Sequence, residues 1–324
     1  MSASLGEFEL IRRFFDRQGP AAPGVATGIG DDCAVLSPTP GWQWLVSTDM
    51  LVEGRHFLST VDPERLGHKA LAVNLSDLAA CGATPRAFFL ALSLPRAEAR
   101  FLEGFARGLF KLADAHGIAL AGGDTTAGPL NVCITVMGEA PQGQALLRSG
   151  ARPGDELWVS GTLGDARLAL EVFRGTQGLA GDAFAQVRRA MELPQPRVAL
   201  GQALRGIASS AIDVSDGLMG DLGHVLKASG VGATIDFEAL PRSAVLAGQD
   251  LPLQQECLLA GGDDYELVFT APPQRHQAVL DAAARAGTLV RCVGRIRAEP
   301  GLEVRDPQGA PLALRFASFD HFKS

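Results

Sequence analysis

Hydrophobic residues recur along the chain with two different periods, and these periods predict helices and strands that follow one another in both halves. Apolar side chains three and four positions apart are typical of an amphipathic helix, whereas strict alternation or a short apolar run is typical of a strand. The helical spacing predicts helices over residues 8–15, 63–81, 97–116, 163–173, 218–229 and 253–259, two more around 194–196, and one from 273. The strand pattern predicts strands over residues 42–52, 87–94, 118–121, 130–139, 156–160, 210–214, 231–237, 265–270 and 289–296. This alternation is typical of an α/β to α+β protein.

Polar residues mark several ends of these elements. Asp62 and Pro63 supply a helix N-cap and a proline at the first helical position. The first long strand is expected to end near Ser47-Thr48-Asp49, and the short third strand to deliver the loop Gly122-Gly123-Asp124. Aspartates are therefore expected at the junctions between elements and loops.

The length of 324 residues fits about two domains of ordinary size. Gly150-Ala151-Arg152-Pro153-Gly154 is a small, turn-forming segment between two ordered stretches, and it is the best candidate boundary. We therefore expect one domain over residues 1–149 and a second over residues 150–324.

Charge and hydropathy exclude several classes of partner. The formal net charge is −7, and no run of lysine or arginine is present, so neither nucleic acid nor an anionic membrane surface is an expected partner. The longest apolar runs, such as Ala87–Leu94, are far shorter than the roughly 20 residues that span a bilayer. No secretory signal is visible at the N-terminus.

Five cysteines are scattered along the chain without a CxxC pair. A disulfide framework and a zinc site are therefore not expected, and a reducing cytoplasm fits best. We expect all five to behave as small buried hydrophobic residues.

The common ATP-binding fingerprints are missing from the sequence. None of the lysines follows a glycine, so no GxxxxGK[ST] phosphate loop exists, and the HRD and DFG motifs of protein kinases are missing too. Gly28-Ile29-Gly30 lacks the third glycine of a dinucleotide-binding fingerprint.

Aspartates beside glycines or at expected junctions are the remaining candidates for chemistry. Flanking glycines let backbone amides approach a ligand closely, and converging carboxylates repel one another unless cations lie between them. All-oxygen ligands suit Mg²⁺, which commonly bridges carboxylates to substrate phosphates. The elements are Gly30-Asp31-Asp32, Ser47-Thr48-Asp49, Asn74-Leu75-Ser76-Asp77, Gly122-Gly123-Asp124, Asp213-Val214-Ser215-Asp216-Gly217 and Gly261-Gly262-Asp263-Asp264. Together they indicate a protein that handles a polyphosphate with Mg²⁺.

Seven collinear motifs resemble those of the thiamine-monophosphate kinase family. The resemblance runs in order from Gly6-Glu7-Phe8 to Asp320-His321-Phe322, nearly the whole chain. The wider superfamily contains aminoimidazole-ribonucleotide synthetase and selenophosphate synthetase, which share a glycine- and aspartate-rich ATP site without a phosphate loop. The motifs are Gly28-Ile29-Gly30-Asp31-Asp32-Cys33-Ala34, Ser47-Thr48-Asp49, residues 72–80, Gly122-Gly123-Asp124-Thr125-Thr126, Arg148-Ser149-Gly150-Ala151, residues 212–218 and Gly262-Asp263-Asp264-Tyr265-Glu266-Leu267.

The resemblance implies ATP-dependent phosphorylation of thiamine monophosphate to thiamine diphosphate by direct in-line transfer, the last step of thiamine diphosphate biosynthesis. It also implies a two-domain synthetase-like protomer. The N-terminal domain would bind ATP and Mg²⁺ and pair with a second copy into a dimer-spanning β-barrel, giving a homodimer. The C-terminal domain would be an α/β sandwich.

The resemblance also assigns roles to individual residues by motif. Several Mg²⁺ ions would be held by Asp32, Ser47, Thr48, Asp49, Asp77, Asp124, Asp213 and Asp216. ATP would contact Gly123, Asp124, Arg148 and Ser215, and thiamine monophosphate would contact His56, Asp263 and Phe319. Two of these positions depart from the family's usual residues, because Asp263 is often Glu and Phe319 is often Tyr or Trp. Both changes keep charge or aromatic character, so they bear on fine geometry rather than on activity. No residue is expected to act as nucleophile or strong base, because a phosphate acceptor is already ionised.

Two other interpretations stay open at the level of sequence. Another member of the superfamily would be a synthetase that uses ATP to phosphorylate an amide or carbonyl oxygen. A protein of a different class would bind divalent cations without catalysis, with the aspartates serving a structural ion. At single positions, His56 could merely cap a turn after Glu53-Gly54, and Phe319 could be a core residue.

Overall fold

The structure is a computed structural model that describes residues 6–17, 23–30 and 33–312. The chain divides into two compact units, one made of Met1–Leu78 with Ala83–Gly143 and the other of Ala79–Gly82 with Gln144–Ser324. Each unit contains a mixed sheet with helices packed against it, as the alternation of elements predicts.

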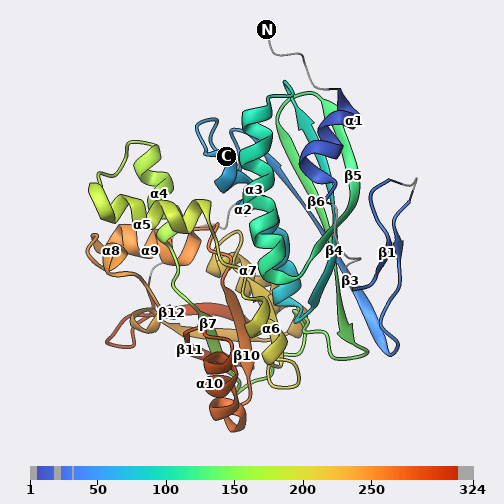
Figure 1. The fold of residues 1–324 in the computed structure, drawn as a ribbon. Helices are drawn as coiled ribbons and strands as arrows, with labels where there is room; N and C mark the ends of the chain where they lie inside the picture. The colour runs from blue at the N-terminus through green and yellow to red at the C-terminus, as the bar shows by residue number, and fades with distance from the viewer. Residues whose placement is uncertain (1–5, 18–22, 31–32, 313–324) are drawn as a thin grey trace. The chain divides into compact units, whose positions relative to one another are not determined.

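The first unit is built around one long sheet (Figure 1). Its strands, in spatial order, are β3 (Trp42–Val52), β6 (Asn131–Pro141), β4 (Thr84–Leu94) and β5 (Ala119–Ala127). Neighbouring strands are antiparallel except β4 and β5, which are parallel. The predicted strands over residues 42–52, 87–94 and 130–139 are confirmed.

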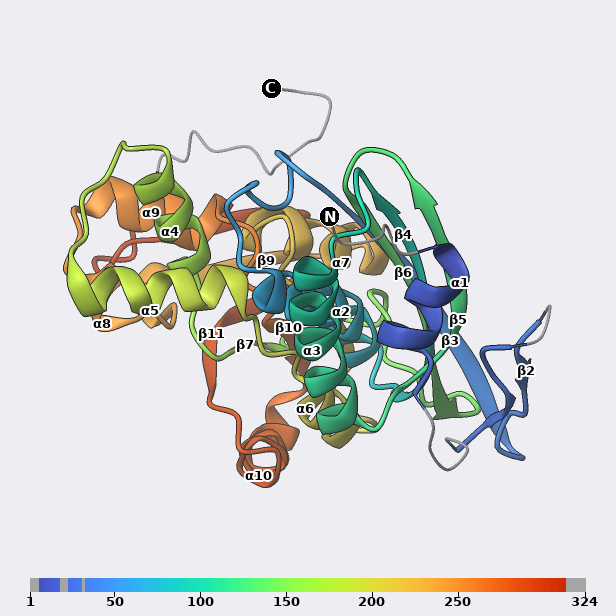
Figure 2. The same cartoon turned by 45° about the horizontal axis from the view of Figure 1, so that its top comes forward.

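Two long helices, α2 (Pro63–Ala80) and α3 (Ala99–His116), lie side by side on one face of this sheet (Figure 2). They approach to backbone contact because glycines lie where they meet. A Cβ atom added to Gly108 would lie 1.8 Å from the carbonyl oxygen of Glu64, and one added to Gly67 would lie 2.0 Å from that of Phe105. Only glycine fits at such a separation, so these residues set the spacing of α2 and α3.

The opposite face of the sheet is open within this unit. Val46 and Met50 on β3 have exposed fractions of 58% and 53%, although both are large and apolar. Thr48 lies between them in sequence and pairs with Thr135 of β6, with 2.8 Å between their hydroxyl oxygens. One face of β3 therefore carries apolar side chains that nothing in the described chain of this unit covers.

The N-terminal helix takes an unusual form. The predicted helix over residues 8–15 consists of a short α1 (Glu7–Leu10) followed by a π-helix, η1 (Ile11–Phe15). Phe15 is buried and packs edge-on against Phe105 of α3, with ring centroids 6.5 Å apart. A small ladder of β1 (Val25–Thr27) with β2 (Val35–Leu36) follows, and the sequence pattern did not predict it.

The second unit contains a larger sheet. Its strands, in spatial order, are β12 (Gly301–Arg305), β9 (Gly232–Asp236), β11 (Val290–Arg297), β7 (Glu156–Ser160), β10 (Leu267–Ala271) and β8 (Ser210–Asp213). All neighbours are antiparallel except β12 and β9. The sequence pattern predicted each of these strands except β12.

Helices cover both faces of the second sheet (Figure 1). The main apolar core lies between the sheet and α4 (Asp165–Phe173), α5 (Gly181–Glu192), α7 (Leu218–Ser229), α8 (Ala244–Ala247) and α9 (Leu251–Ala260). On the other face, Trp158 stacks on Phe269 and contacts His276. That face carries α6 (Val198–Ala203) and α10 (His276–Arg285). Two short 3₁₀ turns are η2 (Phe237–Ala239), whose Phe237 belongs to the main apolar core, and η3 (Pro273–Arg275), which precedes α10.

The structure overturns several local expectations. Asp49, Asp77 and Asp124 do not lie at junctions, because β3 continues to Val52, α2 to Ala80 and β5 to Ala127. Tyr265 does not begin a strand: its backbone is left-handed, and β10 begins at Leu267. The pattern failed here because hydrogen bonding to a neighbouring strand, rather than local hydropathy, decides where a strand ends.

The expectation for the cysteines is wrong in most cases. Cys257 is buried, whereas Cys33 is exposed and Cys81, Cys133 and Cys292 are partly exposed. All five are free thiols in the structure.

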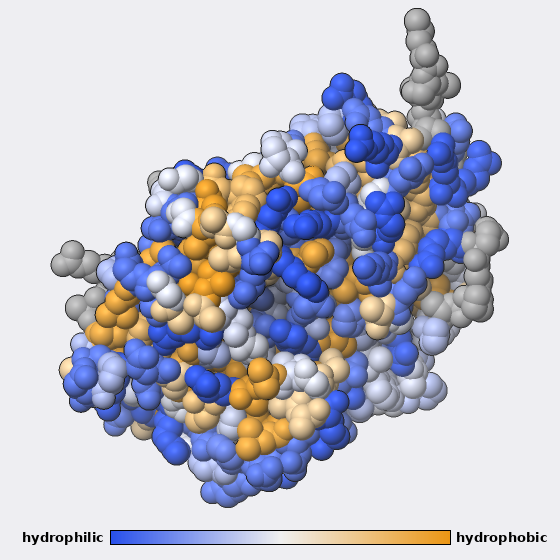
Figure 3. Space-filling view, turned by 60° about the vertical axis from the view of Figure 1, so that its left-hand side comes forward, coloured by the Kyte–Doolittle hydropathy of each residue, from blue (hydrophilic) through white to orange (hydrophobic). Residues whose placement is uncertain are grey.

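On the side of the molecule drawn in Figure 3, apolar residues lie in small groups among hydrophilic ones. Scattered apolar residues of this kind are normal on protein surfaces. None of the described helices combines the length and the apolar character that crossing a membrane requires.

Candidate functional site

Two glycine-rich motifs of the first unit meet at a cavity of about 1150 Å³. Gly28 and Gly30 line it from the loop after β1, and Gly122, Gly123 and Asp124 line it from β5. The π-helix η1 contributes Ile11 and Phe15, and Cys33 and Phe89 are among the other lining residues. Two motifs that are about 90 residues apart in sequence thus border one hollow, somewhat larger than the roughly 300–1,000 Å³ that is typical of small-molecule sites.

Gly123 has a structural reason to be glycine inside β5. Its φ is +147°, and a Cβ atom there would lie 1.9 Å from the carbonyl oxygen of Leu90 on β4. A bulge at Ala121 shifts the register between the two strands just before this point. The expected loop at Gly122-Gly123-Asp124 is therefore part of strand β5. Because of the bulge and the missing side chain of Gly123, the backbone of this strand forms part of the cavity wall.

Strand β3 and helix α2 bring a second group of predicted ligands together. The hydroxyl of Ser47 donates a hydrogen bond to a carboxylate oxygen of Asp77. The backbone N–H of Asp49 donates to the side-chain oxygen of Asn74, at 3.1 Å. Because residues alternate across a strand, Ser47 and Asp49 share the face toward α2, while the Thr48 side chain lies on the opposite face with Thr135.

His56 lies in a turn that follows β3. Its ring Nδ1 accepts a hydrogen bond from the backbone N–H of Val52, at 3.0 Å, and its carbonyl oxygen accepts one from the Lys69 ammonium group, at 3.3 Å. A neutral imidazole that accepts at Nδ1 carries its proton at Nε2. The turn-capping role considered for His56 is therefore real, and it fixes the orientation of the ring.

The second unit presents its aspartates at the end of β8. Asp213 is buried at the last position of the strand, and Ser215 and Asp216 follow in the half-buried loop that leads into α7. The backbone N–H groups of Ser215, Asp216 and Gly217 all donate to one carboxylate oxygen of Asp221, at 3.0, 3.0 and 3.1 Å. Asp221 thus holds the loop in place.

Sequence reasoning missed Asp221, although it lies beside a glycine in the first turn of α7. Burial raises the pKa of its carboxyl group to about 7, even though the three backbone hydrogen bonds favour the charged form. An aspartate four to six positions after an Asp-Gly turn is a local signal that could have found it.

The segment Gly261–Glu266 packs directly onto this loop. The backbone N–H of Asp263 donates to the carbonyl oxygen of Ser215, at 2.9 Å, and that of Tyr265 donates to the carbonyl oxygen of Val214, at 2.8 Å. A Cβ atom on Gly262 would lie 2.4 Å from the same Ser215 oxygen, so the approach requires glycine. The residue expected to contact thiamine monophosphate and the one expected to contact ATP are therefore hydrogen-bonded neighbours.

The remaining predicted residues have simpler surroundings. Arg148 is exposed, and its carbonyl oxygen accepts a hydrogen bond from Ser229 at the end of α7, at 3.3 Å. Asp124 is exposed on β5. Asp32 and Phe319 lie outside the described residues.

The donor atoms fit a hard divalent cation by their chemistry. Ser47, Asp49 and Asp77 offer only oxygen atoms, as do Asp213 and Asp216 within the second unit, and oxygen is the donor that Mg²⁺ prefers. Within the described ranges, no three His, Cys, Asp or Glu residues gather closely enough to hold a metal by themselves. The described residues could therefore contribute only part of a coordination shell, and in many protein sites phosphate oxygens complete the shell of Mg²⁺.

Comparison with known proteins assigns the fold to a class. The model of the AIR synthase related protein N-terminal domain matches residues 30–140, and that of the C-terminal domain matches residues 152–307. The chain is therefore a two-domain protein of the AIR synthase related class, with a mixed sheet in each half.

The similarity to individual proteins is closer still. The thiamine-monophosphate kinase of Salmonella typhimurium is 46% identical over 322 residues, which is 98% of both chains. The crystal structure of thiamine-monophosphate kinase from Stenotrophomonas maltophilia is 42% identical, with a TM-score of 0.83 over 92% of this chain and 94% of that one. The structure of AaThiL complexed with AMPPCP and TMP is 30% identical, with a TM-score of 0.76 over 88% and 89% of the two chains. The chain belongs to the thiamine-monophosphate kinase family.

Proposed function

We propose that this protein transfers the terminal phosphoryl group of ATP directly to thiamine monophosphate and releases ADP and thiamine diphosphate. One geometric observation carries the proposal: the backbone of Asp263, expected at thiamine monophosphate, is hydrogen-bonded to that of Ser215, expected at ATP, at 2.9 Å. The family relationship and the relative complexed with AMPPCP and TMP support the same activity. In-line transfer needs the two substrates side by side, and these two loops lie against each other.

The proposed site residues follow the family motifs. Asp32, Ser47, Asp49, Asp77, Asp124, Asp213 and Asp216 would hold Mg²⁺, and several ions are expected because the carboxylates are many. Thr48 would join them only through its backbone, because its side chain lies on the opposite face of β3 with Thr135. Gly123, Asp124, Arg148 and Ser215 would contact ATP. His56, Asp263 and Phe319 would contact thiamine monophosphate, with Phe319 offering an aromatic surface to a cationic heteroaromatic ring.

The chain's own residues would act by position and charge. Bound Mg²⁺ would neutralise phosphate charge as it develops in the transition state. The exposed Arg148 guanidinium would pair with phosphate oxygens, which its planar fork of donors suits. The fixed backbone of Gly123 would admit a phosphate close to β5, and the fixed ring of His56 would present Nε2–H as a donor. No side chain needs to remove a proton from the acceptor phosphate.

We also propose that residues 1–149 form the ATP- and Mg²⁺-binding, dimerising domain and residues 150–324 the C-terminal domain. The open face of β3, with Val46 and Met50 exposed, supports a homodimer in which the sheets of two copies close into a barrel. A cytoplasmic location stays a prediction from the cysteine pattern.

A coupled assay tests the activity. Purified protein is incubated with ATP, Mg²⁺ and thiamine monophosphate, and ADP and thiamine diphosphate are quantified together. We expect equal amounts of both products, loss of turnover in EDTA and recovery with Mg²⁺ without added Zn²⁺.

The same assay separates the other two interpretations. Release of ADP without thiamine diphosphate would point to a synthetase that phosphorylates another acceptor. Binding of Mg²⁺ by calorimetry, without binding of ATP and without either product, would point to a structural cation site. Either result would reject the proposed kinase activity.

A further inference from the structure

The segment that carries Asp263 is held in a backbone conformation that ordinary residues avoid. Asp263 has a φ of +66° and Tyr265 a φ of +51°, and among the described residues no other non-glycine residue has a positive φ. Two such residues so close together persist only where the surrounding structure holds them, and such sites cluster at functional positions. Two buried carboxyl groups, those of Glu266 and Asp264, hold this segment.

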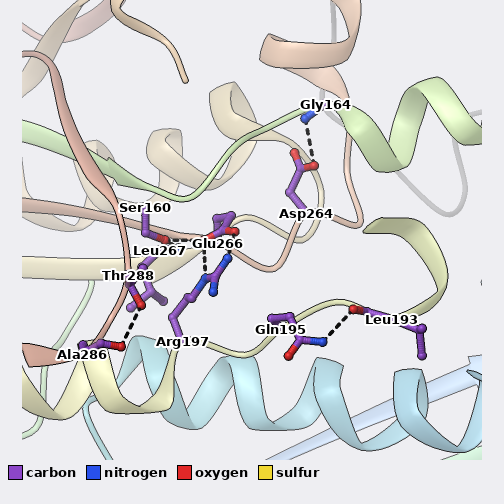
Figure 4. Close-up of polar contacts among 10 residues, drawn as sticks. All are labelled: Ser160, Gly164, Leu193, Gln195, Arg197, Asp264, Glu266, Leu267, Ala286 and Thr288. Carbon is purple, nitrogen blue, oxygen red and sulfur yellow. Dashed lines mark hydrogen bonds and ion pairs between the residues drawn. The ribbon is translucent and has the colours of Figure 1, made fainter. Parts of the chain in front are cut away.

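One anchor is a buried ion pair on the C-terminal side. Glu266 is 5% exposed, and the Arg197 guanidinium donates to both of its carboxylate oxygens, with 2.7 Å between Nε and Oε2 (Figure 4). Ser160 of β7 donates its hydroxyl hydrogen to the same carboxylate and accepts the backbone N–H of Leu267, at 2.8 Å. The carboxylate also lies over Gly161, where a Cβ atom would be 2.0 Å from Oε1. Charge, geometry and close packing thus fix Glu266 in one orientation.

A second anchor lies two residues earlier. One carboxyl oxygen of Asp264 accepts the backbone N–H of Gly164, at 2.9 Å, just before helix α4 begins (Figure 4). The other oxygen is buried with no hydrogen-bond partner among the described residues. Burial raises the pKa of this carboxyl group well above its ordinary value. Asp264 and Glu266 therefore point inward on either side of Tyr265, whose hydroxyl donates to Asp263, at 3.0 Å.

The neighbouring loop has an anchor of its own. Asp221 holds the backbone of Ser215–Gly217 through its three accepted hydrogen bonds, and it makes none of the contacts described for Glu266. Loosening the Glu266 anchor should therefore disturb Asp263 more than Ser215. A larger effect on thiamine monophosphate than on ATP would therefore distinguish a loosened Asp263 turn from a general loss of folding.

We propose that Arg197 and Glu266 are positioning residues for thiamine monophosphate: their buried ion pair holds the left-handed Asp263–Tyr265 turn so that Asp263 faces the substrate. Neither residue touches substrate in this proposal, and both act through Asp263. The inference rests on the proposed function, because Asp263 is its substrate residue. It adds a positioning role to residues that the family motifs do not assign to any ligand.

The test replaces the pair as a unit. Removing one partner would leave a buried charge unpaired, whereas exchanging both for apolar residues of similar volume is often neutral for stability. The variant is R197M/E266M, and the matched control is R188M/E192M on α5. There Arg188 also donates to both oxygens of a buried glutamate from Nε, at 3.0 Å each. KM is measured for thiamine monophosphate and ATP separately, and hydrogen exchange is followed over residues 261–267.

We expect KM for thiamine monophosphate to rise at least tenfold in R197M/E266M, which corresponds to about 1.4 kcal/mol. KM for ATP should change less than threefold, and the control should change less than twofold for both substrates. The amides of Asp263 and Tyr265 should exchange at least tenfold faster. An unchanged KM for thiamine monophosphate, an equal rise for ATP, or the same rise in the control would overturn the positioning role.

A second variant keeps the proposal testable if the double variant does not fold. R197K retains the charge but loses the planar two-pronged contact, so it should raise KM for thiamine monophosphate about threefold or more. No rise in a folded R197K would overturn the proposal. If wild-type protein does not use thiamine monophosphate, the proposed function fails instead, and exchange over residues 261–267 still decides whether the pair holds the turn.

Discussion

At the scale of single residues, the pKa of a buried carboxyl group depends on how many hydrogen-bond donors surround it. Glu139 on β6 is buried, yet it accepts hydrogen bonds from Thr39 and from Arg86. Burial by itself would raise its pKa, but these bonds outweigh burial and the pKa lies below its ordinary value. Asp264 has a single hydrogen-bond donor among the described residues, and burial prevails there. Hydrogen bonds therefore lower the pKa of one buried carboxyl group, whereas burial raises the pKa of another.

Glu139→Gln should destabilise the protein in a pH-dependent way. A lowered folded-state pKa means that Glu139 contributes stability above its unfolded pKa of about 4.5 and loses it as pH falls through the lower folded value. We expect a loss of about 1–3 kcal/mol at pH 7. The difference from wild type should shrink below about pH 4.5.

Urea unfolding at several pH values measures this difference. Glu103→Gln is the control, because the ion pair of Glu103 with Arg13 is exposed and should contribute little. A wild-type–variant difference for Glu139 that is the same at pH 7 and pH 3.5 would contradict the account.

Asp49→Asn and Asp213→Asn separate metal binding from a structural role within strands β3 and β8. Asparagine has nearly the same size as aspartate and keeps a side-chain oxygen acceptor, but each change removes a negative charge from the proposed Mg²⁺ ligands. We expect turnover to fall by about two orders of magnitude or more, because charge stabilisation of phosphoryl transfer is lost. The melting temperature without ligands should be equal or higher, because carboxylate repulsion is relieved.

Turnover against Mg²⁺ concentration and a thermal melt of each variant provide the comparison. Asp182→Asn, at an exposed position in the first turn of α5, is the matched control and should behave like wild type. Near-normal turnover in both site variants would remove Asp49 and Asp213 from the metal site.

At the scale of elements, close packing decides which residues a helix or strand can contain. Helices α2 and α3 touch through Gly67 and Gly108, and α2 carries Asn74 and Asp77 against β3. The spacing of the two helices therefore bears directly on the candidate site. From the sequence, these glycines are recognisable only as residues of low helix propensity within a helical pattern.

Gly108→Ala should destabilise the protein, although alanine is the better helix former. The added Cβ atom would lie 1.8 Å from the Glu64 carbonyl oxygen, so the helices must move apart, at a cost of about 1–3 kcal/mol. Gly223→Ala on α7 is the matched control, because nothing lies within 4 Å of its added Cβ atom. There the change should stabilise by about 0.5–1 kcal/mol.

Urea denaturation of the two variants measures both effects. The predicted signs are opposite for the same chemical change. A stabilising effect at both positions would show that α2 and α3 can separate without cost.

At the scale of the whole molecule, the uncovered face of β3 matters most. Val46 and Met50 are large apolar residues with more than half of their surface exposed. Exposed apolar faces of this kind commonly mark an interface. The face belongs to the same strand as Ser47 and Asp49, so whatever covers it also supports the site.

Val46→Glu should convert a dimer into a monomer, because a charge on this face cannot be buried against a second copy without a partner. Leu289→Glu is the control at an exposed apolar position of the second unit, 83% exposed, and should leave the assembly unchanged. Sedimentation or light scattering gives the mass in solution. A wild-type monomer at micromolar concentration, or a dimer that survives Val46→Glu, would reject this face as the interface.

The sequence by itself determined the features that depend on neighbouring residues. Alternation over residues 42–52 predicted β3, and Asp62-Pro63 predicted the start of α2, because periodicity and helix caps act over a few residues. The collinear glycine and aspartate motifs were sufficient to identify the family, since they are short stretches of sequence that need no knowledge of contacts.

Only the tertiary structure decided the features that depend on distant residues. Gly123 is part of a strand because β4 lies beside it, and β12 exists because β9 offers it an edge. Arg197 meets Glu266 across 69 positions of sequence, and Asp264 meets Gly164 across 100. No local pattern encodes such pairs, because each side chain taken alone resembles an ordinary surface charge. Burial gives these contacts their effect. An unpaired buried charge costs free energy, whereas a paired and hydrogen-bonded one is held in a single position.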